Sequence, residues 1–129
     1  MRTAKYFLTA VMTTCLVAGL YVFGAADDAK PKYEISEIMD MAHKAPKGKM
    51  SLLQLVVKGK ASDEQKKQLL EYYEELAKNK PEKGDVKDWQ KRTNVLIKAA
   101  KDAANGKEGA AQELQKAANC KGCHQAHKG

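Results

Sequence analysis

The sequence predicts an all-α protein whose main part is an antiparallel four-helix bundle. From residue 27 onward, apolar residues recur at spacings of three and four, which places them on one face of a helix. The same region contains no alternating apolar and polar run and no hairpin dipeptide between β-branched runs. Short connections rich in Gly, Pro and Lys separate the helical stretches, and short connections place successive helices antiparallel.

The first 26 residues have the pattern of a secretory signal peptide. Arg2 and Lys5 precede an uncharged apolar stretch over 6–23, and the small residues of 24–26 follow it. Cleavage near residue 26 would leave one exported domain, residues 27–129. Its net charge would be +5, since the whole chain carries +7 and both lost charged residues are basic. The alternative is an uncleaved membrane anchor, because about 18 apolar residues can span a bilayer.

The first helical stretch is expected at about Tyr33–Lys44. Ala45–Gly48 interrupts it, because proline cannot continue a helix and glycine loosens the chain. Helix is expected to resume near Lys49. The apolar face of the first stretch contains Ile35, Ile38, Met39, Ala42 and His43, and that of the resumed stretch contains Leu52, Leu53, Val56 and Val57.

The second helix is expected to begin at Ser62, whose Ser-x-x-Gln sequence with Gln65 has the form of a capping box. It should end near Asn79, before a loop with Pro and Gly. Its inward-facing residues would be Leu69, Tyr72, Tyr73 and Leu76.

Two further helices are expected, one at about Asp85–Asn105 and the last at about Lys107–His127. The inward face of the third contains Val86, Trp89, Thr93, Leu96, Ile97 and Ala100, and that of the fourth contains Ala111, Leu114, Ala117 and Ala118. Alanine leaves room on the inner face of the last helix. A flat apolar prosthetic group would fill such a space and add hydrophobic stabilisation of about 25 cal/mol per Å².

The last helix carries the motif Cys-Lys-Gly-Cys-His, in which Cys120, Cys123 and His124 lie on one side of a helix. Cys-x-x-Cys-His is the attachment motif of c-type haem: the two cysteines form thioethers and the histidine binds the iron. A zinc site that adds His127 is the main alternative, although ligands on one continuous helix do not surround a point tetrahedrally. A redox disulfide is the third reading, but no βαβ pattern accompanies the motif.

With this motif on its last helix, the chain resembles the cytochrome c′ and cytochrome c556 family of four-helix-bundle monohaem cytochromes. The resemblance covers residues 27–129 loosely and the C-terminal motif specifically. Lys128 matches the basic residue that follows the haem histidine by four positions in that family. Met39 matches the first-helix residue on the distal side of the iron, which is methionine in the electron-transferring members and apolar in the high-spin ones.

The resemblance implies one covalent haem c per chain, with His124 as the proximal iron ligand. On the distal side, Met39 is the first candidate, an open or water-bound site is the second, and His43, one turn away on the same face, is the third. A thioether ligand raises the reduction potential of the iron, whereas a second imidazole lowers it.

The leading hypothesis is an exported, periplasmic one-electron carrier that serves redox partner proteins, acidic ones being favoured by the positive charge. It is expected to have no enzymatic activity, because no residue set suggests substrate turnover. The alternatives are a five-coordinate haem protein that binds NO or CO and a zinc-stabilised interaction module. Nucleic acid is not expected as a partner, and a membrane only if residues 1–26 stay attached. The sequence is also compatible with a homodimer.

Overall fold

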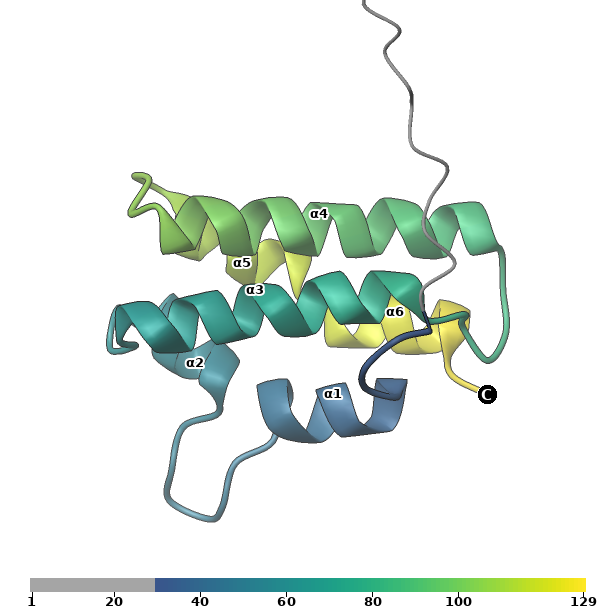
Figure 1. The fold of residues 1–129 in the computed structure, drawn as a ribbon, viewed down its shortest axis with the longest axis horizontal. Coiled ribbons are helices and arrows are strands. Elements are labelled where there is room, and N and C mark those ends of the chain that lie inside the picture. Colours follow the sequence, from purple (N-terminus) through teal and green to yellow (C-terminus); the bar gives the residue numbers. More distant parts are fainter. Residues whose placement is uncertain (1–29) are drawn as a thin grey trace, which may run out of the picture.

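The computed structural model describes residues 30–129, and the predicted signal peptide or anchor lies outside the described residues. The described part contains helices and no strand, so the fold is all-helical, as predicted, and consistent with a helical bundle (Figure 1). The helices are α1 (Ile35–His43), α2 (Leu52–Val57), α3 (Asp63–Lys78), α4 (Val86–Ala104), α5 (Ala110–Ala117) and α6 (Cys120–His127).

The first helical stretch is interrupted at 45–48, as predicted, and forms α1 and α2. α2 begins at Leu52, slightly later than the expected restart near Lys49. The reason is a local cap: the Ser51 hydroxyl accepts a hydrogen bond from the backbone N–H of Gln54 at 3.2 Å. The Gln54 side chain accepts in return from the Ser51 N–H at 2.9 Å, which completes a capping box.

α3 and α4 follow their predicted bounds closely. The predicted capping box is confirmed, because the hydroxyl of Ser62 accepts from the N–H of Gln65 at 3.2 Å and the Gln65 side chain accepts from the Ser62 N–H at 2.9 Å. α4 begins after Asp85, whose carboxylate accepts from the N–H of Asp88 at 2.8 Å. Both helices therefore start where side-chain oxygens satisfy their first amides.

The prediction of one continuous last helix was wrong, because the chain forms α5 and α6 instead. The backbone leaves the helical conformation at Ala118 and Asn119, with ψ angles of 51° and 84°. The Asn119 side chain then accepts a hydrogen bond from the N–H of Gly122 at 3.0 Å and caps a new helix. The cysteine motif therefore occupies a short helix of its own, with a direction independent of α5.

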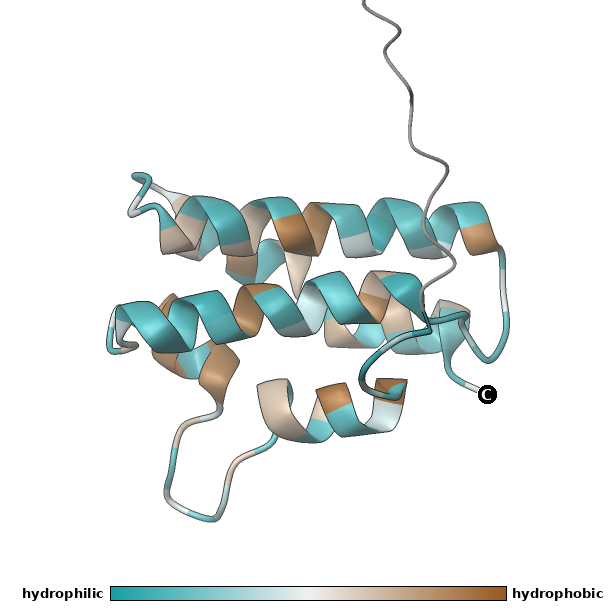
Figure 2. Ribbon diagram, in the orientation of Figure 1, coloured by the Kyte–Doolittle hydropathy of each residue, from teal (hydrophilic) through white to brown (hydrophobic). Residues whose placement is uncertain are grey.

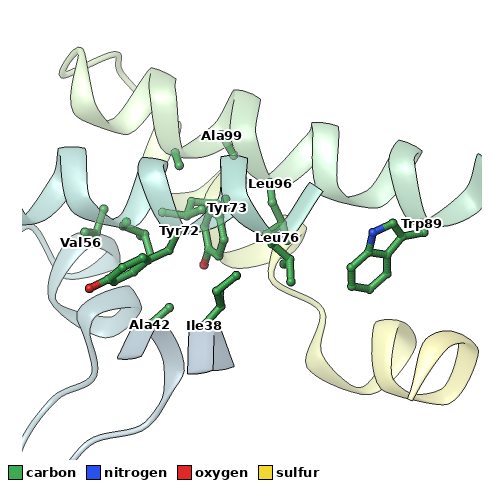
Figure 3. Close-up of a cluster of buried hydrophobic side chains, with 12 residues drawn as sticks. Ile38, Ala42, Val56, Tyr72, Tyr73, Leu76, Trp89, Leu96 and Ala99 are labelled. Carbon is green, nitrogen blue, oxygen red and sulfur yellow. The ribbon is translucent and has the colours of Figure 1, made fainter. Parts of the chain in front are cut away.

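The buried core gathers around α3, between α1, α2, α4 and α5 (Figure 3). The inward residues predicted for α3 are all buried. Those confirmed as buried in α4 are Trp89, Thr93, Leu96 and Ala100. Val86, however, is 50% exposed, because it is the first residue of α4 and lies outside the packed middle of the helix. Hydrophobic residues alternate with hydrophilic ones along α3 and α4 at helical spacing, as the colours of Figure 2 show.

α3 and α4 run antiparallel side by side, and α5 packs against α4 (Figure 1). α1 and α2 pack against each other and against α3. α6 differs, because its backbone makes no comparably close approach to another helix of the described part. Over residues 30–129, no helix is both long and apolar enough to cross a membrane.

Candidate functional site

α6 presents the three motif residues at the edge of the protein interior. Cys123 is half-buried, whereas Cys120 and His124 are exposed. Both cysteines are free thiols. Burial raises the pKa of the Cys123 thiol, and only the nearby Arg92 guanidinium acts in the opposite direction, so this sulfur is held as the neutral thiol.

Two adjoining cavities lie beside α6. The first, of about 180 Å³, is walled mainly by apolar groups and is called the apolar cavity below. The second, of about 220 Å³, has charged residues at its edge and is called the polar-rimmed cavity. Met39, Lys44, Cys123 and His124 line both cavities. Small-molecule sites measure about 300–1,000 Å³, a range that the two cavities reach only when taken together.

All five residues singled out from the sequence line the apolar cavity. They are Met39, His43, Cys120, Cys123 and His124. The first two come from α1 and the other three from α6, so the two helices form facing walls. The other lining residues are mainly apolar, namely Leu76 of α3, Leu96 of α4 and Ala117 and Ala118 at the end of α5, and they are joined by Lys44 and Asn119. Of the alanines expected to leave space next to the motif, Ala117 and Ala118 border this cavity, whereas Ala111 does not line it.

His43 and Met39 differ in how the protein holds them. The Nε2 atom of His43 lies 3.0 Å from the hydroxyl oxygen of Tyr73 on α3, and the two ring centroids are 5.8 Å apart. Met39 is half-buried and packs against the core. Burial lowers the pKa of His43, and His124 nearby lowers it further, so the imidazole is held neutral. Burial also raises the pKa of Tyr73, with a further contribution from Cys120, so the phenol keeps its proton.

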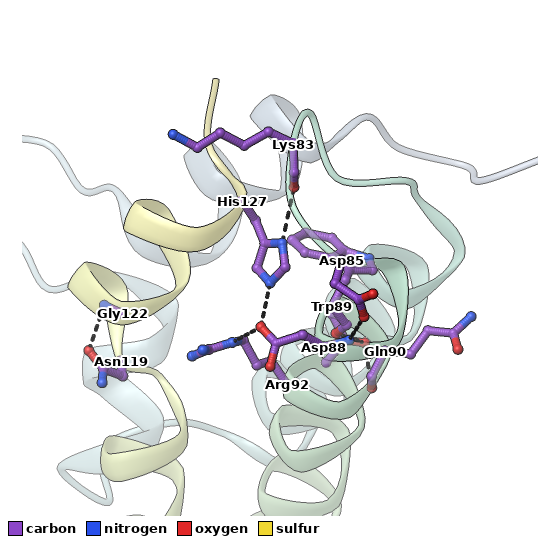
Figure 4. A network of polar contacts seen from close by, with 10 residues as sticks. Lys83, Asp85, Asp88, Trp89, Gln90, Arg92, Asn119, Gly122 and His127 are labelled. Carbon is purple, nitrogen blue, oxygen red and sulfur yellow. Dashed lines mark hydrogen bonds and ion pairs between the residues drawn. The ribbon is translucent and has the colours of Figure 1, made fainter.

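His127 does not take part in the cavity chemistry that the zinc alternative required. It is 4% exposed, with Nδ1 3.1 Å from the carbonyl oxygen of Lys83 and Nε2 2.9 Å from a carboxylate oxygen of Asp88 (Figure 4). Its ring also meets Trp89 edge-on, with centroids 5.4 Å apart. In the described residues, no group of three or more Cys, His, Asp or Glu side chains is arranged to hold a metal ion. The four ligands of the zinc alternative therefore do not converge.

These contacts belong to a connection between the C-terminal residues 126–129 and residues 82–89, called the C-terminal clasp below. The N–H of Lys83 donates to the carbonyl of His127 at 3.3 Å, and the N–H of Gly129 donates to the Glu82 carboxylate at 2.6 Å. Gly84 has φ +86° and lies so close to the backbone carbonyl of residue 126 that a Cβ atom would overlap it. The clasp therefore fixes one end of α6 while its side faces the cavities.

The clasp also depends on the charge of one carboxylate. The Arg92 side chain donates to Asp88 at 2.6 Å, and this contact, followed by the one with His127, holds the pKa of Asp88 below its usual range. Both contacts favour the ionised carboxylate, which accepts from two directions at once.

Two functional side chains escaped the sequence reasoning. Tyr73 was expected only as a core residue, and nothing in its helical position names His43 as its partner. Asp88 was not singled out at all. An aspartate at the third residue of a helix that has an Asp cap is typical of helix starts, so the second role of Asp88 in holding His127 gives no separate sequence signal.

Comparisons with known proteins add no family assignment. No protein-family model matches the chain, and neither a curated protein nor a solved structure is significantly similar to it.

Proposed function

We propose that this chain is an exported monohaem c-type cytochrome that carries one electron, with the haem between α1 and α6. One observation carries the proposal: Cys120, Cys123 and His124 of the motif line the same apolar cavity as Met39 and His43 of α1. Its all-helical fold and the resemblance to the cytochrome c′ and cytochrome c556 family support the same reading. An exported location would meet the requirement for covalent haem attachment outside the cytoplasm.

The residues of α6 would attach and orient the group. Cys120 and Cys123, one helical turn apart, would each form a thioether by adding the S–H across a vinyl double bond, which consumes no external oxidant. His124 would be the proximal ligand and would bind the iron through a ring nitrogen. The neutral Cys123 thiol and the apolar walls suit an uncharged ring more than a hydrated ion.

The residues present fit such a group on two further counts. Apolar walls exclude water from the ring. The polar-rimmed cavity is lined by Lys44 and Lys128 and also by Asp40 and Glu82, and Lys44 pairs with Asp40, so Lys128 is the cation that would meet an acidic substituent of a ligand. α6 keeps its place through the C-terminal clasp, without close packing that a ligand would have to displace. The clasp therefore fixes the position of α6, while the cavities beside α6 remain available to a ligand.

Met39 is the proposed distal ligand. It lines both cavities opposite the motif and brings a thioether on an unbranched side chain. His43 lines the same cavity, but its Nε2 already contacts the Tyr73 hydroxyl. When bound, the haem iron supplies the one-electron chemistry, and a thioether ligand keeps its reduction potential higher than an imidazole would. The positive domain would guide an acidic redox partner toward it.

The optical spectrum of the purified holoprotein tests this proposal. We expect covalent haem, a sharp low-spin ferrous α band, slow or no CO binding and the ferric charge-transfer band of a methionine–iron bond. Met39→Ala should remove the charge-transfer band and admit CO. A protein exported and folded without any Soret band would contradict the cytochrome assignment.

The second candidate function is a five-coordinate haem protein that binds NO or CO. The contact between His43 and Tyr73 favours this second function. With His43 occupied, Met39 is the remaining α1 candidate for the distal ligand, so the distal side of the iron would be open if Met39 does not bind. A broad high-spin ferrous spectrum with rapid CO binding in the wild-type protein would support this candidate over the electron carrier.

A further inference from the structure

A buried tyrosine hydroxyl lies directly behind the cavity wall. The Tyr73 residue is 0% exposed, in the middle of α3 and surrounded by apolar side chains. Burying a hydroxyl without a partner is unfavourable, so its contact with His43 satisfies a polar group that would otherwise be isolated. A phenylalanine at this position would pack equally well. The hydroxyl group therefore requires a reason other than packing.

The contact with Tyr73 makes the Nε2 atom of His43 unavailable to a metal, whichever tautomer is present. If the tyrosine O–H donates, the lone pair of Nε2 accepts it and is not available for a metal. If His43 donates instead, Nε2 carries the proton and again has no free lone pair. The imidazole is neutral in both cases, in accord with its lowered pKa. To bind a metal through Nε2, the ring must break its contact with Tyr73.

His43 is otherwise well placed to compete with Met39. The two are one helical turn apart on α1 and line the same apolar cavity, and His124 is close enough to His43 to influence its charge. An imidazole and a thioether on iron give different reduction potentials. A protein that uses Met39, or keeps the site open, therefore needs to restrain His43.

We infer that Tyr73 is a positioning residue that holds His43 away from the haem iron and so reserves the distal side of the site for Met39 or for an external ligand. This inference rests on the proposed cytochrome function. Tyr73 touches neither the cofactor nor its ligand in this scheme. Its effect on the potential and on the spin state passes entirely through His43.

The test is Tyr73→Phe, which removes the hydroxyl and retains the ring in the core. A single net hydrogen bond shifts an equilibrium by about two- to tenfold, so the ratio of His43-bound to otherwise ligated iron should rise by about that factor. The readouts are the ferric electron paramagnetic resonance spectrum, the methionine–iron charge-transfer band and the midpoint potential. We expect a bis-imidazole signal to grow, the charge-transfer band to weaken and the potential to fall.

Tyr72→Phe is the matched control. Tyr72 is the next residue of the same helix, equally part of the core, and its ring packs edge-on against Tyr33 at 5.7 Å. It should leave all three readouts unchanged. The double variant Tyr73→Phe/His43→Ala should return the wild-type spectrum, because the competing ligand is then absent.

Each outcome decides between the two proposals. If wild-type protein carries no covalent haem, the cytochrome assignment fails and this inference fails with it. If covalent haem is present but Tyr73→Phe leaves the ligand ratio unchanged, the inference alone is wrong. It is also wrong if the change persists in the double variant. His43→Ala alone gives an independent check that does not alter Tyr73, since loss of the wild-type low-spin signal would show that His43 was the ligand already.

Discussion

Replacing His127 with alanine probes the attachment of α6 most directly. The substitution removes an imidazole that, when protonated, donates both to the Lys83 carbonyl at 3.1 Å and to the Asp88 carboxylate at 2.9 Å, and it also removes the edge-on contact with Trp89. Each hydrogen bond contributes about 0.5–1.5 kcal/mol net, and an aromatic pair contributes a similar amount. We therefore expect the free energy of unfolding to fall by about 2–4 kcal/mol.

Urea unfolding followed by far-ultraviolet circular dichroism measures this loss, with Gln125→Ala as the control. Gln125 is exposed on the same helix, so its replacement should change the free energy of unfolding by less than about 0.5 kcal/mol. Hydrogen exchange should also accelerate in α6 more than in α3, because the clasp is what holds α6 in place. Equal destabilisation by His127→Ala and Gln125→Ala would refute the idea that the clasp anchors α6.

Three further predictions concern the clasp and the motif. The pKa of Asp88 is lowered from 3.8 in the folded state, so its ionised form stabilises the fold above pH 3.8 and the benefit disappears as pH falls through the folded pKa. The difference in unfolding free energy between wild type and Asp88→Asn should therefore be full near neutral pH and vanish in acid. Gly84→Ala should lower the melting temperature more than Gly106→Ala, because both glycines have positive φ but only the first meets backbone atoms. Cys120→Ala combined with Cys123→Ala should leave no haem bound after denaturation and acid-acetone extraction, whereas each single variant retains one thioether.

Local signals were sufficient for most of the helices. Apolar spacing, the Ser62 capping box and the interruption at 45–48 depend on residues close together in the chain, and the structure follows all three. The exception is the last helix. Ala117, Ala118 and Asn119 include neither glycine nor proline, and a polar cap in an Ala-rich stretch is a weak signal against good helix formers.

The candidate site divides in the same way. The motif on α6 and the candidate residues of α1 could be predicted from the sequence. The motif is a fixed spacing of Cys and His, and helical periodicity places the α1 residues on one face. Their meeting at one cavity, and the contacts of His43 with Tyr73 and of His127 with Asp88, appear only in the tertiary structure. These pairs are 30 and 39 residues apart. Helical periodicity shows which face of a helix turns inward, whereas the partner across that face is chosen by how the helices pack.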